Sequence, residues 1–239
     1  MVNNIAVIGS SGAIGSAFTQ QLAVLYPEAT IHAFSRSEPN ETTQNTSHYR
    51  IDYADEASIE AAALLASKYF PLTMIVIATG ILHDDGVEPE KSLKELSAVK
   101  FRRLFEVNTI LPALIAKHFL PKLSKDKRVV FAAISARVGS ISDNHLGGWY
   151  AYRSSKAALN MIIKNAAIEI GRRNKQAVIV GLHPGTVDSV LSEPFQRNVP
   201  EAKLFTPEFS VKKLLIVLEN LTAKDSGKCF AWDGREVEP

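Results

Sequence analysis

Short apolar runs alternate with helical segments along the whole of this 239-residue chain. The fourth, fifth and sixth of seven such runs are almost free of polar residues, which is typical of parallel strands that helices cover on both faces. This alternation therefore predicts an α/β fold, with a doubly wound parallel sheet between two layers of helices. Strands are expected at residues 5–8, 30–34, 48–51, 73–78, 129–135, 177–182 and 228–233.

Helical periodicity fills most of the intervals between these strands. The stretch 184–209, by contrast, has four prolines and no clear period, and a loop of that length favours a functional role. Because α/β chains of this size commonly form one unit, we expect a single domain over residues 1–239, in which 184–209 is a substrate-binding loop. Helices are expected at residues 14–25, 56–69, 92–123, 152–172 and 210–221.

The composition is ordinary and argues against several classes of partner. Charged residues make up 22% and apolar residues 46% of the chain, and a net charge of +2 gives no reason to expect nucleic acid. The apolar runs are far shorter than the roughly 20 residues that span a bilayer. A lone cysteine, Cys229, and an N-terminus without a signal-like apolar run indicate the cytoplasm. No metal site and no membrane contact are expected.

Tyr152 and Lys156 stand four residues apart at the start of a predicted helix, so their side chains lie on one face. A nearby ammonium favours the phenolate, and lowering a tyrosine pKa from about 10 to about 7 takes roughly 4 kcal/mol. Such a phenol can give a proton to a carbonyl oxygen or take one from an alcohol. The same spacing also arises by chance, in which case Tyr152 is an amphipathic residue beside a solvated lysine.

A glycine-rich turn joins the first predicted strand to its helix. It contains Gly9, Gly12 and Gly15, with Ser11 and Ile14 between them. Glycines at this point let the backbone turn sharply and let a pyrophosphate approach the free N–H groups of the helix. We therefore expect these five residues to bind a dinucleotide in a Rossmann-type fold. The alternative is a turn of purely structural purpose.

The end of the second predicted strand carries Ser35, Arg36 and Ser37, where an acidic residue usually meets the free ribose hydroxyl of NAD. A guanidinium pairs with a phosphate through two hydrogen bonds. Arg36 therefore favours NADP(H) over NAD(H), unless it is an ordinary surface charge.

Together these motifs resemble those of the short-chain dehydrogenase/reductase family over essentially the whole chain. The glycine turn is similar to the family's G-x-x-x-G-x-G, with Ala13 at the middle glycine and Gly12 one residue early. The resemblance implies that Tyr152 and Lys156 are the catalytic pair. It also implies that Asn108 joins a water-linked proton path to the lysine.

The resemblance implies further cofactor contacts outside the glycine turn. Asp52 matches the aspartate that contacts the adenine, and Gly80 is the one residue kept from the family's segment after the fourth strand. The residues from 184 to 187 are similar to the segment that lies along the nicotinamide. The implied contacts are completed by Tyr152, Lys156, Pro184, Gly185, Thr186 and Val187.

The activity implied by the resemblance is hydride transfer between C4 of the nicotinamide and a carbonyl carbon, as in an NADPH-dependent carbonyl reductase. Residues 81–92 and 137–149 look like those of C-factor-like or sniffer-like carbonyl reductases. The family also implies a homodimer or homotetramer and a small carbonyl or alcohol substrate. A different class stays open, namely a sensor or signalling protein that binds NADP(H) without turnover.

The family's two serines before a glycine are only partly present here. The sequence I-S-A-R-V-G stands at residues 134–139, and a gapless count back from its glycine puts Ala136 where the family has its catalytic serine. We expect Ser135 to polarise the carbonyl, because it ends an apolar strand at the carboxyl edge of the sheet, where sites of this fold lie. The alternatives are Ser140, Ser142 or no hydroxyl at all.

Overall fold

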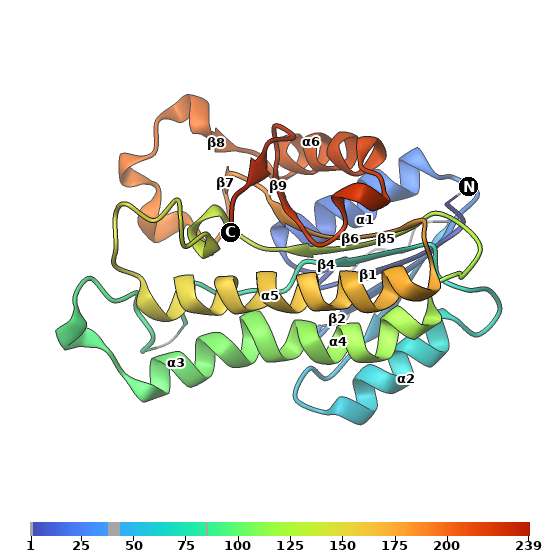
Figure 1. The fold of residues 1–239 in the computed structure, drawn as a ribbon, viewed down its shortest axis with the longest axis horizontal. Coiled ribbons are helices and arrows are strands. Elements are labelled where there is room, and N and C mark those ends of the chain that lie inside the picture. Colours follow the sequence, from blue (N-terminus) through green and yellow to red (C-terminus); the bar gives the residue numbers. More distant parts are fainter. Residues whose placement is uncertain (1, 38–43, 85) are drawn as a thin grey trace.

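The computed structural model describes residues 2–37, 44–84 and 86–239, and its centre is a sheet of eight strands (Figure 1). The strands are β1 (Asn4–Ile8), β2 (Thr30–Ser35), β3 (Thr46–Arg50), β4 (Met74–Ile77), β5 (Val129–Ile134), β6 (Ala177–His183), β9 (Cys229–Ala231) and β10 (Glu236–Val237). Their order is β10-β9-β6-β5-β4-β1-β2-β3, and every neighbouring pair is parallel except β9 with β10. The predicted doubly wound sheet is confirmed, with an antiparallel edge strand that the sequence did not predict.

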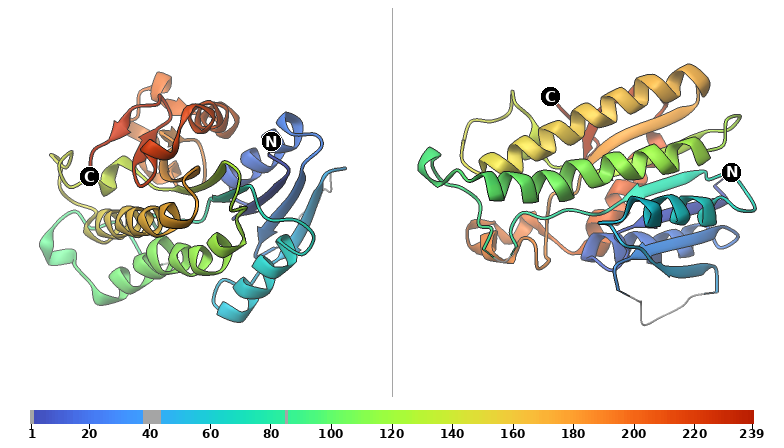
Figure 2. Two further views of the ribbon diagram at one scale, coloured as in Figure 1. Left: turned by 45° about the vertical axis from the view of Figure 1, so that its right-hand side comes forward. Right: turned by 90° about the horizontal axis from the view of Figure 1, so that it is seen from below.

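Helices cover both faces of this sheet. They are α1 (Ala13–Leu25), α2 (Glu56–Ala66), α3 (Ala98–Phe105), α4 (Leu111–Phe119), α5 (Tyr150–Arg173) and α6 (Pro207–Asn220). α1 and α6 lie on one face, and α2, α4 and α5 lie on the other, as the views of Figure 1 and Figure 2 show. Within the described ranges, none of the helices is long and apolar enough to cross a membrane.

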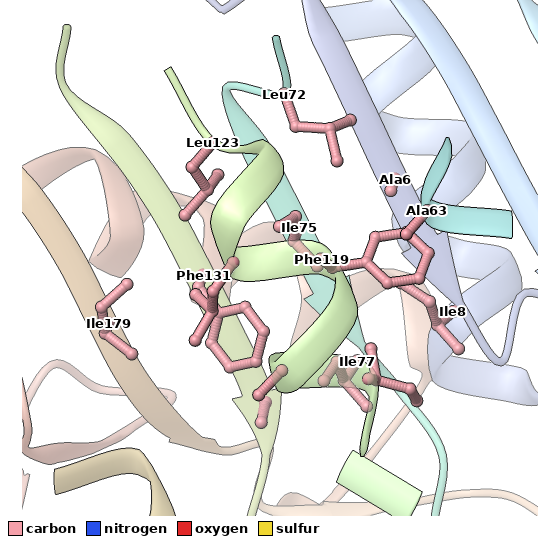
Figure 3. Close-up of a cluster of buried hydrophobic side chains, with 14 of the residues drawn as sticks. Ala6, Ile8, Ala63, Leu72, Ile75, Ile77, Phe119, Leu123, Phe131 and Ile179 are labelled. Carbon is pink, nitrogen blue, oxygen red and sulfur yellow. The ribbon is translucent and has the colours of Figure 1, made fainter. Parts of the chain in front are cut away.

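Alternating side chains of each central strand enter two separate cores. On β1, Ile5 and Val7 join Phe18 of α1 in one core, whereas Ile8 joins Phe119 of α4 in the other. Figure 3 shows this second core, in which Phe119 lies among side chains of β1, β4 and α2. Successive side chains of a strand point to opposite faces. Both neighbours in the sequence must therefore be apolar, which explains the unbroken apolar runs.

The helical region predicted at 92–123 is divided by a π-helical turn. This turn, η2 (Glu106–Ile110), joins α3 to α4, and the N–H of Leu111 donates to the carbonyl of Glu106. Pro112 does not break the helix, because it lies in the first turn of α4, where the proline ring is tolerated. Short 3₁₀ helices flank the region at η1 (Leu93–Glu95) and η3 (Leu120–Lys122).

The stretch 184–209 is more ordered than the sequence predicts. It holds a pair of short parallel strands and two 3₁₀ helices, namely β7 (Thr186–Val187), β8 (Leu204–Phe205), η5 (Glu193–Asn198) and η6 (Glu201–Lys203). α6 begins at Pro207, before the expected start at residue 210, because Thr206 caps the helix by accepting the N–H of Phe209 at 3.1 Å. Strands of two residues are too short to produce a periodic pattern, so the sequence could not reveal them.

The loops that follow the carboxyl ends of the parallel strands gather at one end of the molecule. In Figure 1 this end is on the left, where the segment with β7 and β8 lies above the start of α5 and the chain entering α3 lies below it. Ligands of open α/β sheets bind at this edge. A ligand-binding site is therefore expected at this end of the molecule.

Candidate active site

Tyr152 and Lys156 lie side by side on the first turns of α5, at this end of the sheet. Lys156 is 2% exposed, and its Nζ atom is 6.0 Å from the centroid of the Tyr152 ring. The ammonium also donates a hydrogen bond of 2.9 Å to the carbonyl of Ile134, the last residue of β5. The helix thus holds the predicted pair against the end of the central strand.

Burial dominates the protonation of both groups. It raises the pKa of Tyr152 to about 12 and lowers the pKa of Lys156 to about 8. The expectation that Lys156 lowers the pKa of Tyr152 toward 7 is therefore wrong for these two residues by themselves. The physical reason is that desolvation favours the neutral form of each group. At neutral pH, Tyr152 is a neutral phenol and most of Lys156 is charged.

Asn108 is fully buried inside the π-turn and is bound to the same site. Its side-chain amide donates to the carbonyl of Ile81 at 2.8 Å and to Ser155 Oγ at 3.1 Å, and its Oδ1 accepts the N–H of Ile81 at 2.9 Å. A Cβ atom at Gly80 would lie 3.3 Å from both Asn108 Oδ1 and Lys156 Nζ. The predicted residues Gly80, Asn108 and Lys156 are therefore neighbours, and Ser155 is an addition that the spacing alone did not indicate.

The glycine turn after β1 is built for close backbone contact. Gly9 has φ +87°, and a Cβ atom there would lie 2.9 Å from the carbonyl carbon of Ala78. A Cβ atom at Gly15 would lie only 2.0 Å from the oxygen of Gly9. Gly12 is the N-cap of α1 and offers no side-chain cap, so the helix's first N–H groups are not bound by that residue. Ser11 is exposed and Ile14 is partly buried beside them.

Arg36 and Asp52 lie at the ends of neighbouring segments on the same edge of the sheet. Both are exposed, and the Asp52 carboxylate accepts the N–H of Ala54 at 2.9 Å. Tyr53, which the sequence argument did not single out, donates to the carbonyl of Phe34 at 3.4 Å. Burial raises its pKa to about 12, while the backbone of Gly9 and the charge of Arg36 act in the opposite direction. Its phenol thus lies between the glycine turn and the arginine.

A dinucleotide fits these residues on two observations. The glycines put bare backbone at the N-terminus of α1, whose N-cap residue offers no side-chain cap, and such a helix end attracts anions. In addition, the buried hydroxyl of Thr79, just after β4, has no hydrogen-bond partner within the described part of the chain. A buried hydroxyl without a partner calls for a ligand or a water molecule.

The segment from 184 to 187 is fixed between β6 and α6. Gly185 has φ +79°, and a Cβ atom there would lie 2.7 Å from the ring of Phe205. The carbonyl of Pro184 accepts the Ser210 hydroxyl at 2.7 Å. Thr186 is partly exposed and Val187 is 5% exposed, so only the first of this pair has free surface.

His183, just before this segment, was not among the predicted site residues. Burial lowers its pKa to about 4, with a smaller contribution of the same sign from the charge of Arg137. Its Nδ1 atom is buried without a partner among the residues that the structure describes. The ring is therefore neutral at physiological pH.

The three candidate serines after β5 all have hydrogen-bond partners. Ser135 is 2% exposed and donates to Asn160 Oδ1 of α5 at 2.6 Å. Ser140 accepts the N–H of Asp143 at 3.0 Å, and Ser142 donates to the carbonyl of Pro239 at 2.6 Å. A role of Ser135 in polarising a carbonyl stays a prediction, and it requires the hydroxyl to exchange Asn160 for the substrate. Ala136, 9% exposed, begins the turn at η4 (Arg137–Gly139).

A buried acid fixes the start of α5. Glu90 is 1% exposed, and its Oε2 atom accepts the N–H of Ala151 at 3.2 Å. Its backbone carbonyl accepts the N–H of Trp149 at 2.5 Å. The side chain thus binds one of the free N–H groups at the positive end of α5. A single acidic residue in a polar loop carries no recognisable signal, so sequence reasoning missed it.

Comparison with known proteins defines the class to which this site belongs. The family model described as short chain dehydrogenase matches residues 3–200. The chain belongs to this family of NAD(P)-dependent dehydrogenases and reductases, and the resemblance seen in the sequence is confirmed.

Two curated proteins are similar to this chain in sequence, and their names point to different roles. A 1-hydroxy-2-glutathionyl-2-methyl-3-butene dehydrogenase of Rhodococcus sp. (strain AD45) is 32% identical over 185 residues, which are 77% of this chain and 76% of the relative. The C-signal protein of Myxococcus xanthus is 34% identical over 146 residues, which are 61% of this chain and 82% of the relative.

Two solved structures share the whole fold. NADPH-bound carbonyl reductase from chicken fatty liver has a TM-score of 0.85 and 27% identity, over 100% of this chain and 99% of that one. The carbonyl reductase Sniffer of D. melanogaster has a TM-score of 0.85 and 20% identity, and all of both chains is covered. The predicted similarity to C-factor-like proteins is confirmed by the C-signal relative, and the Sniffer structure shares the fold.

Proposed function

We propose that this chain is an NADP(H)-dependent oxidoreductase that moves a hydride between the nicotinamide and a carbonyl or alcohol substrate. The observation that carries the proposal is the convergence of Tyr152, Lys156 and Asn108 at the carboxyl edge of the sheet. Tyr152 is the acid or base, and Lys156 holds the cofactor ribose. Ser135 is the proposed carbonyl-polarising residue.

The proposed cofactor contacts follow the same edge of the sheet. The N-terminus of α1, with Gly9, Gly12 and Gly15, would hold the pyrophosphate. Arg36 would pair with the 2′-phosphate, which is the basis for preferring NADP(H). When bound, the nicotinamide supplies the hydride, and the chain supplies orientation and the proton. The remaining proposed contacts are Ser11, Ile14, Asp52, Gly80, Tyr152, Lys156, Pro184, Gly185, Thr186 and Val187.

Carbonyl reduction is the direction that the protonation of the site supports. Tyr152, whose pKa burial raises to about 12, is a phenol at neutral pH and is ready to give a proton to the oxygen of a reduced carbonyl. The likeness to a carbonyl reductase at 27% identity points the same way. The Rhodococcus relative, named a dehydrogenase, keeps oxidation of an alcohol as the reverse possibility.

The second candidate is a signalling protein that binds NADP(H) without turnover. The specific observation in its favour is the name of the C-signal relative at 34% identity. The Tyr152 phenol beside Lys156 argues against it, because a protein that only binds the cofactor needs no proton donor at this position.

A screen of aldehydes, quinones and diketones with NADPH and with NADH tests the proposal. We expect consumption of NADPH with at least one carbonyl class. The Tyr152→Phe variant, which keeps the ring and loses the proton, is the matched control and should show none. Tight NADPH binding with no turnover on any of these substrates favours the signalling protein instead.

The domain and assembly predictions belong to the same proposal. We expect one functional unit over residues 1–239, with 184–209 forming the substrate side, in a cytoplasmic homodimer or homotetramer. Apolar side chains that are exposed on η2 and α5 support self-association, namely Ile110, Met161 and Ile168. Light scattering at several concentrations tests it, and a monomer at every concentration contradicts it.

A further inference from the structure

Aromatic side chains from three separate segments meet beside Tyr152. The ring of Trp149 lies 6.2 Å from that of Tyr152 at an interplanar angle of 68°, and 5.1 Å from that of Phe195 at 61°. His83 lies 5.8 Å from Phe195, also at 61°. These distances and angles are those of edge-to-face aromatic pairs. Trp149, Phe195 and His83 are all partly exposed, so each ring keeps free surface.

Trp149 is held in a strained backbone conformation. Its φ of +51° and ψ of +43° are left-handed, and among the described residues it is the only non-glycine with positive φ. That conformation costs roughly 1–2 kcal/mol for an L-residue. Its N–H is bound to the carbonyl of the buried Glu90 at 2.5 Å, and its carbonyl accepts the first helical bond, from Arg153, at 2.9 Å. Strain of this kind persists at functional sites, where the surroundings impose it.

Phe195 is brought to Trp149 by the stretch 184–209. The residue lies in η5, and its N–H donates to the carbonyl of Ser192 at 2.8 Å. The Ser192 hydroxyl in turn donates to the carbonyl of Val187 at 2.5 Å, which ties η5 to β7. A contact of 3.2 Å between His83 Nε2 and the carbonyl of Val190 joins the same stretch to the loop after β4. The aromatic contact therefore spans the segments that enclose the substrate side.

Tyr152 also packs against apolar side chains of two other segments. It lies in one cluster with Ile81 and Val87 of the loop after β4, and with Phe101 and Leu104 of α3. A carbonyl that accepts the Tyr152 proton must lie about 3 Å from the phenol oxygen. Because the rings of Trp149 and Tyr152 lie 6.2 Å apart, a substituent on that carbonyl carbon comes within reach of Trp149. The free surface of the aromatic rings suits a flat, apolar group.

We propose that Trp149 and Phe195 form an aryl-binding wall and that they select carbonyl compounds with a planar ring on the carbonyl carbon. The inference rests on the proposed function, because it takes Tyr152 as the proton donor. Trp149 and Phe195 are specificity-determining residues, since they contact the substituent and not the reacting carbonyl.

The test compares two ketones of equal carbon number, acetophenone and cyclohexyl methyl ketone, with NADPH. The quantity measured is kcat/KM for acetophenone divided by kcat/KM for cyclohexyl methyl ketone, so that differences in overall activity cancel. In Trp149→Asn, where the new residue tolerates the left-handed backbone, the ratio should fall about fivefold or more. Phe195→Leu should lower it in the same direction. Phe209→Leu is the matched control, since this ring packs with Phe205 and Trp232 instead, and its ratio should equal that of the wild type.

The outcomes separate this inference from the proposed function. If the wild type reduces both ketones and neither Trp149→Asn nor Phe195→Leu changes the ratio, the aryl-binding wall is wrong and the proposed function stands. If the wild type consumes NADPH with no ketone, aldehyde or quinone, both are wrong. Melting curves and NADPH titrations confirm that each variant is folded. If Trp149→Asn does not fold, Phe195→Leu decides alone, because it lies in a different segment.

Discussion

The proposed cofactor side and the proposed substrate side of this site are built from different parts of the chain. Where the pyrophosphate is proposed to bind, the cofactor side consists of backbone, namely the glycines of the first turn and the N-terminus of α1, which carries no side-chain cap. The proposed substrate side consists of side chains that loops bring together, such as Trp149 and Phe195. A site made of backbone depends on positions that have no side chain, which are the glycines. A site made of side chains depends on contacts between distant segments, so its specificity can change without disturbing the sheet.

The largest effect is expected on the substrate side, at Tyr152. Tyr152→Phe deletes the proton donor and keeps the ring, so turnover should fall by about 10²–10⁴-fold, while NADPH binding changes only a few-fold. Lys156→Ala should damage both, because the ammonium also serves the ribose. Steady-state rates and dissociation constants separate the two roles. A fully active Tyr152→Phe enzyme would end the catalytic assignment.

The cofactor side is tested by a matched pair of glycines. A Cβ atom at Gly15 would lie 2.0 Å from the oxygen of Gly9, whereas one at Gly12 would lie 3.5 Å from it, at ordinary contact distance. Gly15→Ala should therefore lower the free energy of unfolding by about 3 kcal/mol and weaken cofactor binding. Gly12→Ala should be tolerated, since its φ of −76° suits alanine. Equal melting temperatures for the two variants would contradict the tight backbone cradle.

The serine assignment predicts an effect of similar size. Ser135→Ala should lower turnover by about 10²-fold, as loss of one oxyanion-type donor does, while Ser140→Ala and Ser142→Ala should have little effect. Ala136→Ser sharpens the test, because it puts a hydroxyl at the gapless family position. An unimpaired Ser135→Ala enzyme, together with a faster Ala136→Ser enzyme, would move the role away from Ser135 and its bond to Asn160.

Cofactor choice should depend on one exposed guanidinium. We expect wild type to bind NADPH more tightly than NADH, and Arg36→Ala to lose most of the difference, since a charge-assisted contact contributes about 1.5–3 kcal/mol. Titration of both cofactors into both proteins measures this. Equal affinities of the wild type for the two cofactors would refute the preference.

The smallest predicted effect is a pH dependence that comes from Lys156. Its pKa, which burial lowers to about 8, means that the ammonium is present below that pH and is lost above it. kcat/KM should therefore fall as the pH rises through about 8, and NADPH binding should weaken over the same range. Tyr152, whose pKa is raised to about 12, stays protonated throughout. A flat profile up to pH 10 would contradict this assignment.

The sequence was informative where a single segment determines the outcome. Apolar runs predicted every strand of the parallel sheet, and glycine spacing predicted the cradle after β1, because both depend on local backbone geometry. The aromatic contact between Trp149 and Phe195 could not be predicted, since it joins segments far apart in the chain. The raised pKa of Tyr152 was missed for a related reason, because desolvation depends on everything packed around the phenol.

The geometry of the site depends on the number of residues in the π-turn η2. An α-helix rotates by about 100° for each residue, and a π-turn holds one residue more than an α-turn. Deleting one residue from this turn would remove the extra residue and would rotate α3 about its axis relative to α4. Phe101 and Leu104, which now pack near Tyr152, would then point elsewhere. A one-residue deletion at this point would thus turn the α3 side of the site away from Tyr152, although all side chains of α3 are still present.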